Sequence, residues 1–138
     1  MWAILAFNLA FHSLISSNTL GFDGFNSSWH LGAVLNTTGD TSYLYTGFLF
    51  GHHFNRSNWF YELGGGFAIH DGNQHDGLDE RRRMGSRLLF RYEIGLGYRF
   101  NTNYALQIVH DHISNAGIID DDDNQGLDTY GVRLIYYW

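Results

Sequence analysis

Cysteine, proline and lysine are all absent from this chain of 138 residues. Without cysteine there are no disulfide scaffolds, thiolate zinc sites or cysteine nucleophiles. Positive charge is also scarce, because eight arginines stand against 14 acidic residues and leave a net charge of −6. A nucleic-acid-binding protein with a broad basic surface is therefore not expected. The length fits a single domain over residues 1–138.

Long apolar runs are missing too, so no segment reaches the roughly 18 apolar residues of a transmembrane helix. The most apolar run, 2–15, contains Asn8 and His12 and lacks the positively charged start of a signal peptide. We interpret this run as a strand, with a degenerate signal peptide as the alternative. Aromatic residues make up 17% of the chain beside 17 glycines, a composition that favours strands joined by close turns. We expect an all-β fold.

Alternation of apolar and polar side chains is most complete in residues 86–100, where Phe90, Tyr92 and Ile94 share one face opposite Arg91 and Glu93. The remaining segments interpreted as strands are 2–15, 28–37, 42–54, 58–70, 103–114 and 128–138, and the facing of 42–54 is ambiguous. Strands of about ten to fifteen residues suit a tilted membrane crossing. Bacterial barrels have even strand numbers. We therefore predict a small antiparallel transmembrane β-barrel of eight strands, one hidden within 19–26 or lost from the N-terminus.

Charged side chains recur on the face opposite the apolar one. They are Glu62, Arg87, Arg91, Glu93, Arg99, Asp111 and Arg133. These charges would be costly in a dry core but can pair in a small polar lumen. The short links 38–41 and 101–102 are expected at one end of the barrel, and the long polar links 71–85 and 115–127 at the other.

In segment 103–114, three polar residues lie on the same face as the apolar ones. They are His110, His112 and Ser114. Asp128 likewise lies on the apolar face at the start of the last strand, which can pair antiparallel with 103–114. A serine, a histidine two residues before it and a carboxylate on the next strand have the roles of nucleophile, base and orienting group. The alternative is a set of interfacial residues reaching for headgroups. His110 is expected to contact headgroups or to be structural.

The amino-acid sequence of this region resembles the C-terminal signature of the outer-membrane lipid A 3-O-deacylases of the PagL type. Residues 112–117 read His-Ile-Ser-Asn-Ala-Gly, and 124–128 read Asn-Gln-Gly-Leu-Asp before a closing aromatic strand. In that family, His-x-Ser-Asn-Ala-Gly precedes Asn-x-Gly-x-Glu, and His, Ser and Glu form the triad of an eight-stranded barrel with its site on the lipid-facing surface. The resemblance covers about the last two thirds of the chain, and residues 1–40 match poorly.

The resemblance implies a serine esterase that removes an ester-linked acyl chain, at the 3 position, from lipid A. Ser114 would be the nucleophile, His112 the base and Asp128 the orienting group in place of the family's Glu. The residues implied in oxyanion stabilisation or loop shaping are Asn115, Gly117 and Asn124. No cofactor and no metal are implied. The partners are lipid A or lipopolysaccharide and outer-membrane lipid, with a homodimer as an option, in the outer membrane of a Gram-negative bacterium with the site toward the outer leaflet.

Two charged clusters have a functional and a plain interpretation. Arg81, Arg82 and Arg83 can bind lipid phosphates bidentately or form a solvated loop. The acidic run 120–123 lacks EF-hand spacing and is expected to be solvated. Two other functions stay open. One is a non-catalytic outer-membrane barrel with a structural or adhesive role, and the other is a soluble barrel whose apolar faces point inward around a hydrophobic ligand.

Overall fold

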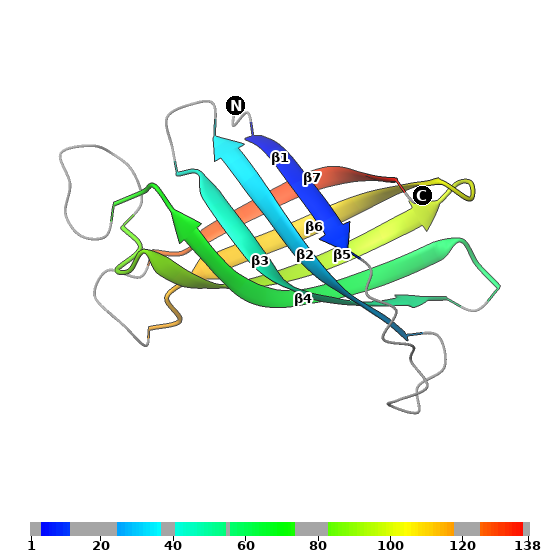
Figure 1. Ribbon diagram of the computed structural model, residues 1–138, viewed down its shortest axis with the longest axis horizontal. Helices are drawn as coiled ribbons and strands as arrows, with labels where there is room; N and C mark the ends of the chain where they lie inside the picture. Colours follow the sequence, from blue (N-terminus) through cyan, green and yellow to red (C-terminus); the bar gives the residue numbers. More distant parts are fainter. Residues whose placement is uncertain are drawn as a thin grey trace.

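Seven antiparallel strands form one sheet in sequence order in the computed structural model (Figure 1). They are β1 (Ile4–Phe11), β2 (Phe25–Asn36), β3 (Tyr43–His53), β4 (Trp59–His70), β5 (Leu88–Arg99), β6 (Tyr104–Ser114) and β7 (Leu127–Tyr136). The structure describes residues 4–11, 25–36, 41–54, 56–73, 83–117 and 125–136, with side chains from residue 27 onward. None of these residues forms a helix long and apolar enough to cross a membrane.

The strands coincide closely with the alternating segments of the sequence, so the predicted all-β antiparallel architecture is confirmed. Each strand pairs with the next through a continuous ladder, and β1 and β7 form the two edges of the sheet. β2 begins at Phe25, within the segment where a hidden strand was expected, and residues 19–24 lie outside the described part of the chain. An eighth strand therefore stays a prediction.

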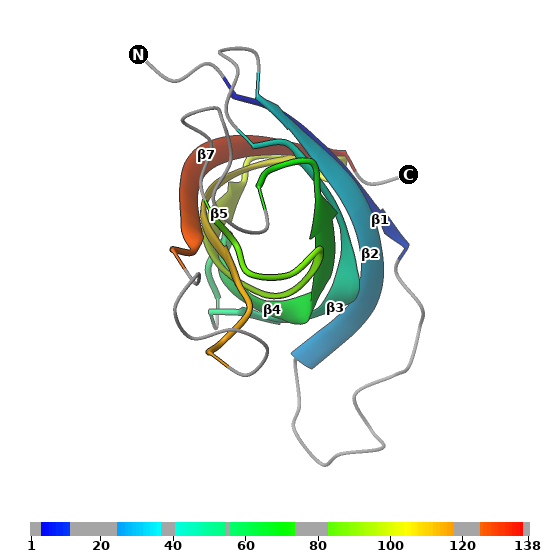
Figure 2. The same ribbon diagram turned by 90° about the vertical axis from the view of Figure 1, so that its left-hand side faces the viewer.

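The sheet curls around a central axis, so it has an inner and an outer face (Figure 2). Large apolar side chains cover the outer face, including Phe48 at 57%, Ile108 at 66% and Val132 at 69% exposure. In β3, the strand of ambiguous facing, Tyr43 and Tyr45 point inward. An apolar exterior around a polar interior is typical of a membrane-spanning barrel. The alternative with its apolar faces inward is wrong.

A network of ion pairs fills the interior. Both Nε and Nη2 of Arg91 donate to Asp111 Oδ2, at 3.0 and 2.8 Å, and Nη2 also pairs with Glu93. Arg133 binds Glu93 through two hydrogen bonds of 2.7 and 2.9 Å. The guanidinium of Arg91 also lies 3.7 Å from the ring centre of Tyr45. These contacts join β3, β5, β6 and β7 across the lumen, which explains how charged residues are accommodated there.

One residue of the expected lumen set lies elsewhere. Arg87 precedes β5 and is exposed, so the prediction that it faces the lumen is wrong. The alternating pattern continues to residue 86, but the ladder of β5 with β4 begins only at Leu88. Outside the ladder, side-chain parity no longer determines which way a residue points.

Replacing Glu93 with glutamine is expected to destabilise the barrel by about 3 kcal/mol, because removing one partner of a buried ion pair leaves the other uncompensated. Glu93 is bound by two arginines with no exposed side-chain area of its own. Urea unfolding in detergent, followed by tryptophan fluorescence, measures the change. Arg87→Gln removes an exposed charge and serves as the control, with an expected change within about 0.5 kcal/mol. Equal effects of the two substitutions would contradict a stabilising role for the interior network.

The antiparallel order places the β2–β3, β4–β5 and β6–β7 links at one end of the sheet, at the left of Figure 1. We call this the site end. Backbone hydrogen bonds join Asp71 to Ser42 at 3.1 Å and Gln125 to Arg83 at 3.0 Å, so the three links are tied together. The expectation that 38–41 shares an end with 101–102 is wrong. Successive links in a meander alternate between ends, and their length does not change this order.

Candidate functional site

The register between β6 and β7 places His112 directly opposite Asp128 and His110 opposite Tyr130. His112 Nδ1 lies 2.9 Å from Asp128 Oδ1, and His110 Nε2 lies 3.0 Å from the same oxygen. An ionised carboxylate only accepts hydrogen bonds, so both imidazole nitrogens act as donors. The structure therefore brings together the predicted base and the predicted orienting group on the outer face of the sheet.

This hydrogen bond determines which nitrogen of His112 is available for chemistry. With its proton on Nδ1, a neutral His112 carries its lone pair on Nε2. A serine hydrolase needs this tautomer, since Nε2 takes the proton of the nucleophile while the carboxylate holds Nδ1–H. The pair His112–Asp128 thus has the geometry of a general base and its orienting group.

Ser114 follows His112 by two residues on the same face of β6, at its end, and is half-buried. Side chains two residues apart on a strand start about 7 Å apart. Within the described part of the chain, no hydrogen bond joins Ser114 to His112. Catalytic hydrogen bonds are often long in the absence of substrate and tighten in the complex. The strand places Ser114 and His112 on the same face, two residues apart.

Two tyrosine rings flank the histidines. Tyr92, opposite His112 on β5, stacks on its ring with centroids 4.8 Å apart and an interplanar angle of 25°. Tyr130 stacks on His110 with centroids 4.6 Å apart at 19°. The sequence analysis did not assign either tyrosine to the site. The alternation of their strands did place both on the apolar face. The stacking restricts the imidazole orientations beside Asp128.

Beyond Ser114 the chain turns sharply. Asn115 is fully buried, and its Oδ1 accepts a hydrogen bond of 2.8 Å from the backbone N–H of Gly117. Ala116 and Gly117 both have positive φ, at 57° and 66°. The N–H of Gly117, a candidate for oxyanion stabilisation or loop shaping, donates within the turn in this structure. Asn124 lies outside the described residues.

Gly126, just before β7, lies beside the edge of the His112 ring that carries Cε1 and Nε2. A Cβ at this position would be 3.2 Å from His112 Cε1 and 3.7 Å from Nε2. The φ of Gly126 is also positive, at 58°, a conformation that glycine adopts without strain. Sequence reasoning did not assign Gly126 a role, although it lies within the quoted motif.

If His112 is the base, as predicted, Gly126→Ala is expected to reduce kcat by about 10-fold to 100-fold, because the added methyl would displace the imidazole ring and even small displacements of a catalytic group slow a reaction. The left-handed backbone adds a strain of about 1 kcal/mol. Gly131→Ala in β7 is the matched control, since its added methyl would meet only Val109 Cγ1 at 3.7 Å. Initial rates and unfolding midpoints of both variants test this. Equal kcat values for the two variants would show that the space beside His112 is unimportant.

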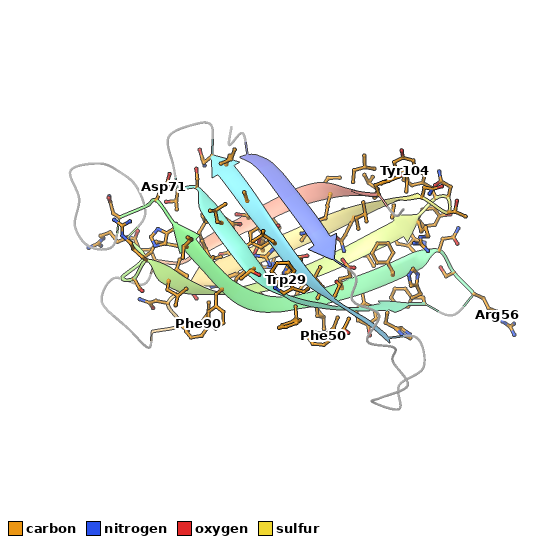
Figure 3. The ribbon with its side chains drawn as sticks, in the orientation of Figure 1. Trp29, Phe50, Arg56, Asp71, Phe90 and Tyr104 are labelled. Atoms are coloured by element: carbon orange, nitrogen blue, oxygen red, sulfur yellow. The ribbon has the colours of Figure 1, made fainter. Side chains whose placement is uncertain are left out.

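Arg83 lies at the site end, where its backbone N–H donates to Gln125 Oε1 at 3.0 Å. The loop that contains Arg81, Arg82 and Arg83, here called the arginine loop, was expected to share an end with Ser114, and this holds for Arg83. Arg81 and Arg82 lie outside the described residues. Figure 3 shows Phe90, the cross-strand partner of Ser114, toward the same end as Asp71 and far from Tyr104. Within the described segments, no cluster of three or more His, Asp or Glu side chains is arranged to hold a metal ion.

Comparison with known proteins connects this chain to one family. The family model described as lipid A 3-O-deacylase (PagL) matches residues 6–137. The fold is similar to that described as the crystal structure of the outer membrane enzyme PagL, with a TM-score of 0.72 and 23% sequence identity, covering 98% of this chain and 88% of that one. No curated protein matches. The match begins at residue 6, so the expectation that the resemblance covers only the last two thirds of the chain is wrong.

Proposed function

The chain belongs to the lipid A 3-O-deacylase (PagL) family, and from this premise we propose that it removes the 3-O acyl chain of lipid A with Ser114, His112 and Asp128 as its catalytic triad. The enzyme is an ester hydrolase of the outer membrane. One observation carries the residue assignment. His112 Nδ1 donates a hydrogen bond of 2.9 Å to Asp128 Oδ1 on the outer face, and Ser114 follows His112 by two residues on the same strand.

The proposed reaction follows from these positions. Ser114 Oγ attacks the ester carbonyl while His112 Nε2 takes its proton, and the negative charge of Asp128 stabilises the imidazolium. Collapse of the tetrahedral intermediate breaks the bond to the 3-oxygen of the sugar, which leaves with the proton from His112. Water then attacks the acyl-enzyme through the same base, and a free fatty acid is released.

The location of the triad suits a substrate that is itself a membrane lipid. Apolar side chains surround the site on the outer face, among them Phe90 and Tyr130, so lipid A can approach laterally within the membrane. The site end also carries the longest link between strands, 71–87, whereas the opposite end carries the links 12–24, 54–58 and 100–103. Longer links are typical of the extracellular side, which supports a site facing the outer leaflet.

The arginine loop supports a second part of the proposal. Arg81 and Arg82 directly precede Arg83 in the sequence, and Arg83 lies at the site end, tied to the β6–β7 link that follows Ser114. Guanidinium groups bind phosphate bidentately. We propose that this loop contacts the phosphates of lipid A while the triad acts on the acyl ester.

Mass spectrometry of lipid A after incubation with detergent-refolded protein tests the activity. The expected result is loss of one ester-linked hydroxyacyl chain from the 3 position, with no further loss from lipid A already lacking that chain. A fluorophosphonate probe is expected to label Ser114 in the same preparation, as an activated serine reacts with it. Unchanged lipid A with folded protein would favour the non-catalytic barrel instead.

A further inference from the structure

The carboxylate of Asp128 has an unusual pair of partners. Its side chain is 55% exposed, and its Oδ1 accepts from both His112 and His110. Among the described residues, these two imidazoles are the only hydrogen-bond partners of that side chain. A short side chain on an exposed strand surface has several rotamers, and one hydrogen bond to His112 would leave its direction poorly defined. The second histidine restricts it.

His110 cannot replace His112 as the base. It precedes Ser114 by four residues on β6, which places the two Cα atoms about 13 Å apart along a strand. Its Nε2–H is directed at Asp128 Oδ1, and its ring is stacked on Tyr130 and meets the edge of Tyr92 at 5.9 Å. His110 therefore acts on the reaction only through Asp128.

The surroundings of His110 also require a partner for its N–H. Its cross-strand neighbours are Ile94 on β5 and Tyr130 on β7, and Ile108 precedes it on the same face. These side chains are exposed on the apolar surface. An unpaired polar group on this apolar surface has a high desolvation free energy. The hydrogen bond to Asp128 reduces it. The apolar setting thereby favours the bridged arrangement of both histidines on one oxygen.

We propose that His110 is a positioning residue of the deacylase, which holds Asp128 Oδ1 against His112 Nδ1 by donating its own Nε2–H to the same oxygen. This inference rests on the proposed function, because it assumes that Asp128 orients the catalytic base. It assigns His110 a part in the reaction beyond contacting headgroups. Its Nε2–H is directed at the carboxylate, so its part in the reaction passes through Asp128.

The test compares three substitutions in steady-state kinetics on lipid A. His110→Phe keeps a ring on Tyr130 but removes the donor, and it is expected to lower kcat about 10-fold to 30-fold with KM unchanged, the loss of one well-placed hydrogen bond to a charged group. His110→Gln supplies an amide N–H near the position of Nε2 and is expected to recover kcat to within about 3-fold of the wild type. His52→Phe, beside Tyr61 at the opposite end, is the matched control and leaves kcat unchanged.

A double-mutant cycle separates positioning from general stability. In an Asp128→Ala background, His110→Phe is expected to cause no further loss of kcat, because its effect passes through the carboxylate. An equal loss in both backgrounds, a higher KM alone, or a fully active His110→Phe would overturn the proposal. Should the phenylalanine variant fail to fold, His110→Ala takes its place in the same cycle.

The Ser114→Ala variant distinguishes a wrong role for His110 from a wrong catalytic triad. If Ser114→Ala is inactive and His110→Phe is fully active, the triad stands and only the role of His110 is wrong. If Ser114→Ala retains activity, the triad and the role of His110 are both wrong.

Discussion

Ser114→Ala is expected to reduce kcat on lipid A by about 10⁶-fold, the order of loss seen when the nucleophile of a serine hydrolase triad is removed. The variant should fold normally, since Ser114 is half-buried at the end of β6 and loses only a hydroxyl. Quantitative mass spectrometry of released fatty acid measures the rate. KM is expected to stay close to the wild-type value, because the serine contributes to the reaction and little to ground-state binding.

Combining Ser114→Ala with His112→Ala provides the control. Residues of one triad act as a unit, so the double variant is expected to be no slower than either single variant. Additive losses would show that the two residues act separately. A Ser114→Ala protein with more than a tenth of wild-type kcat would place the nucleophile elsewhere.

Asp128→Asn is expected to lower kcat by about 10⁴-fold. The substitution removes the charge that stabilises the protonated His112, and its amide can donate to Nδ1. That donation would move the histidine proton to Nε2, where the lone pair is needed. Folding is expected to be unaffected, because the side chain is exposed at the start of β7 and absent from the interior network. Kinetics on lipid A in detergent give the magnitude.

Asp128→Glu is the matched control, as it keeps the carboxylate and lengthens the arm by one methylene. It is expected to retain more than about a tenth of wild-type kcat, because Glu also orients histidine in other triads. If Asp128→Asn and Asp128→Glu had the same kcat, the charge would be irrelevant and His112 would require another orienting group.

The strands and their facing were predictable from the sequence, because side-chain alternation is a local property of an extended chain. On β5, inward-facing Arg91 and Glu93 alternate with outward-facing Tyr92 and Ile94, and the structure confirms this order. Where the ladder ends, the same rule fails, as it does at Arg87. The position of the 38–41 link was also mispredicted, because link length is a weak guide compared with the alternation of ends in an antiparallel meander.

The proposed site was only partly predictable. Ser114 and His112 are two residues apart on one strand, so their common face follows from parity alone. Their relation to Asp128 depends on which residues β6 and β7 pair, and a shift of one residue would move Asp128 to the inner face. The observed register, with His112 opposite Asp128, is therefore a property of the assembled sheet.

The residue sequence alone establishes that this chain forms long alternating strands with charged and apolar side chains on opposite faces, and its motif identifies the candidate nucleophile, base and carboxylate. Cross-strand packing establishes the rest. The second hydrogen bond from His110 to Asp128, the tyrosine rings on both histidines and the contact of Gly126 with His112 join residues from different elements. Such contacts depend on register and backbone conformation, which no local pattern of side chains specifies.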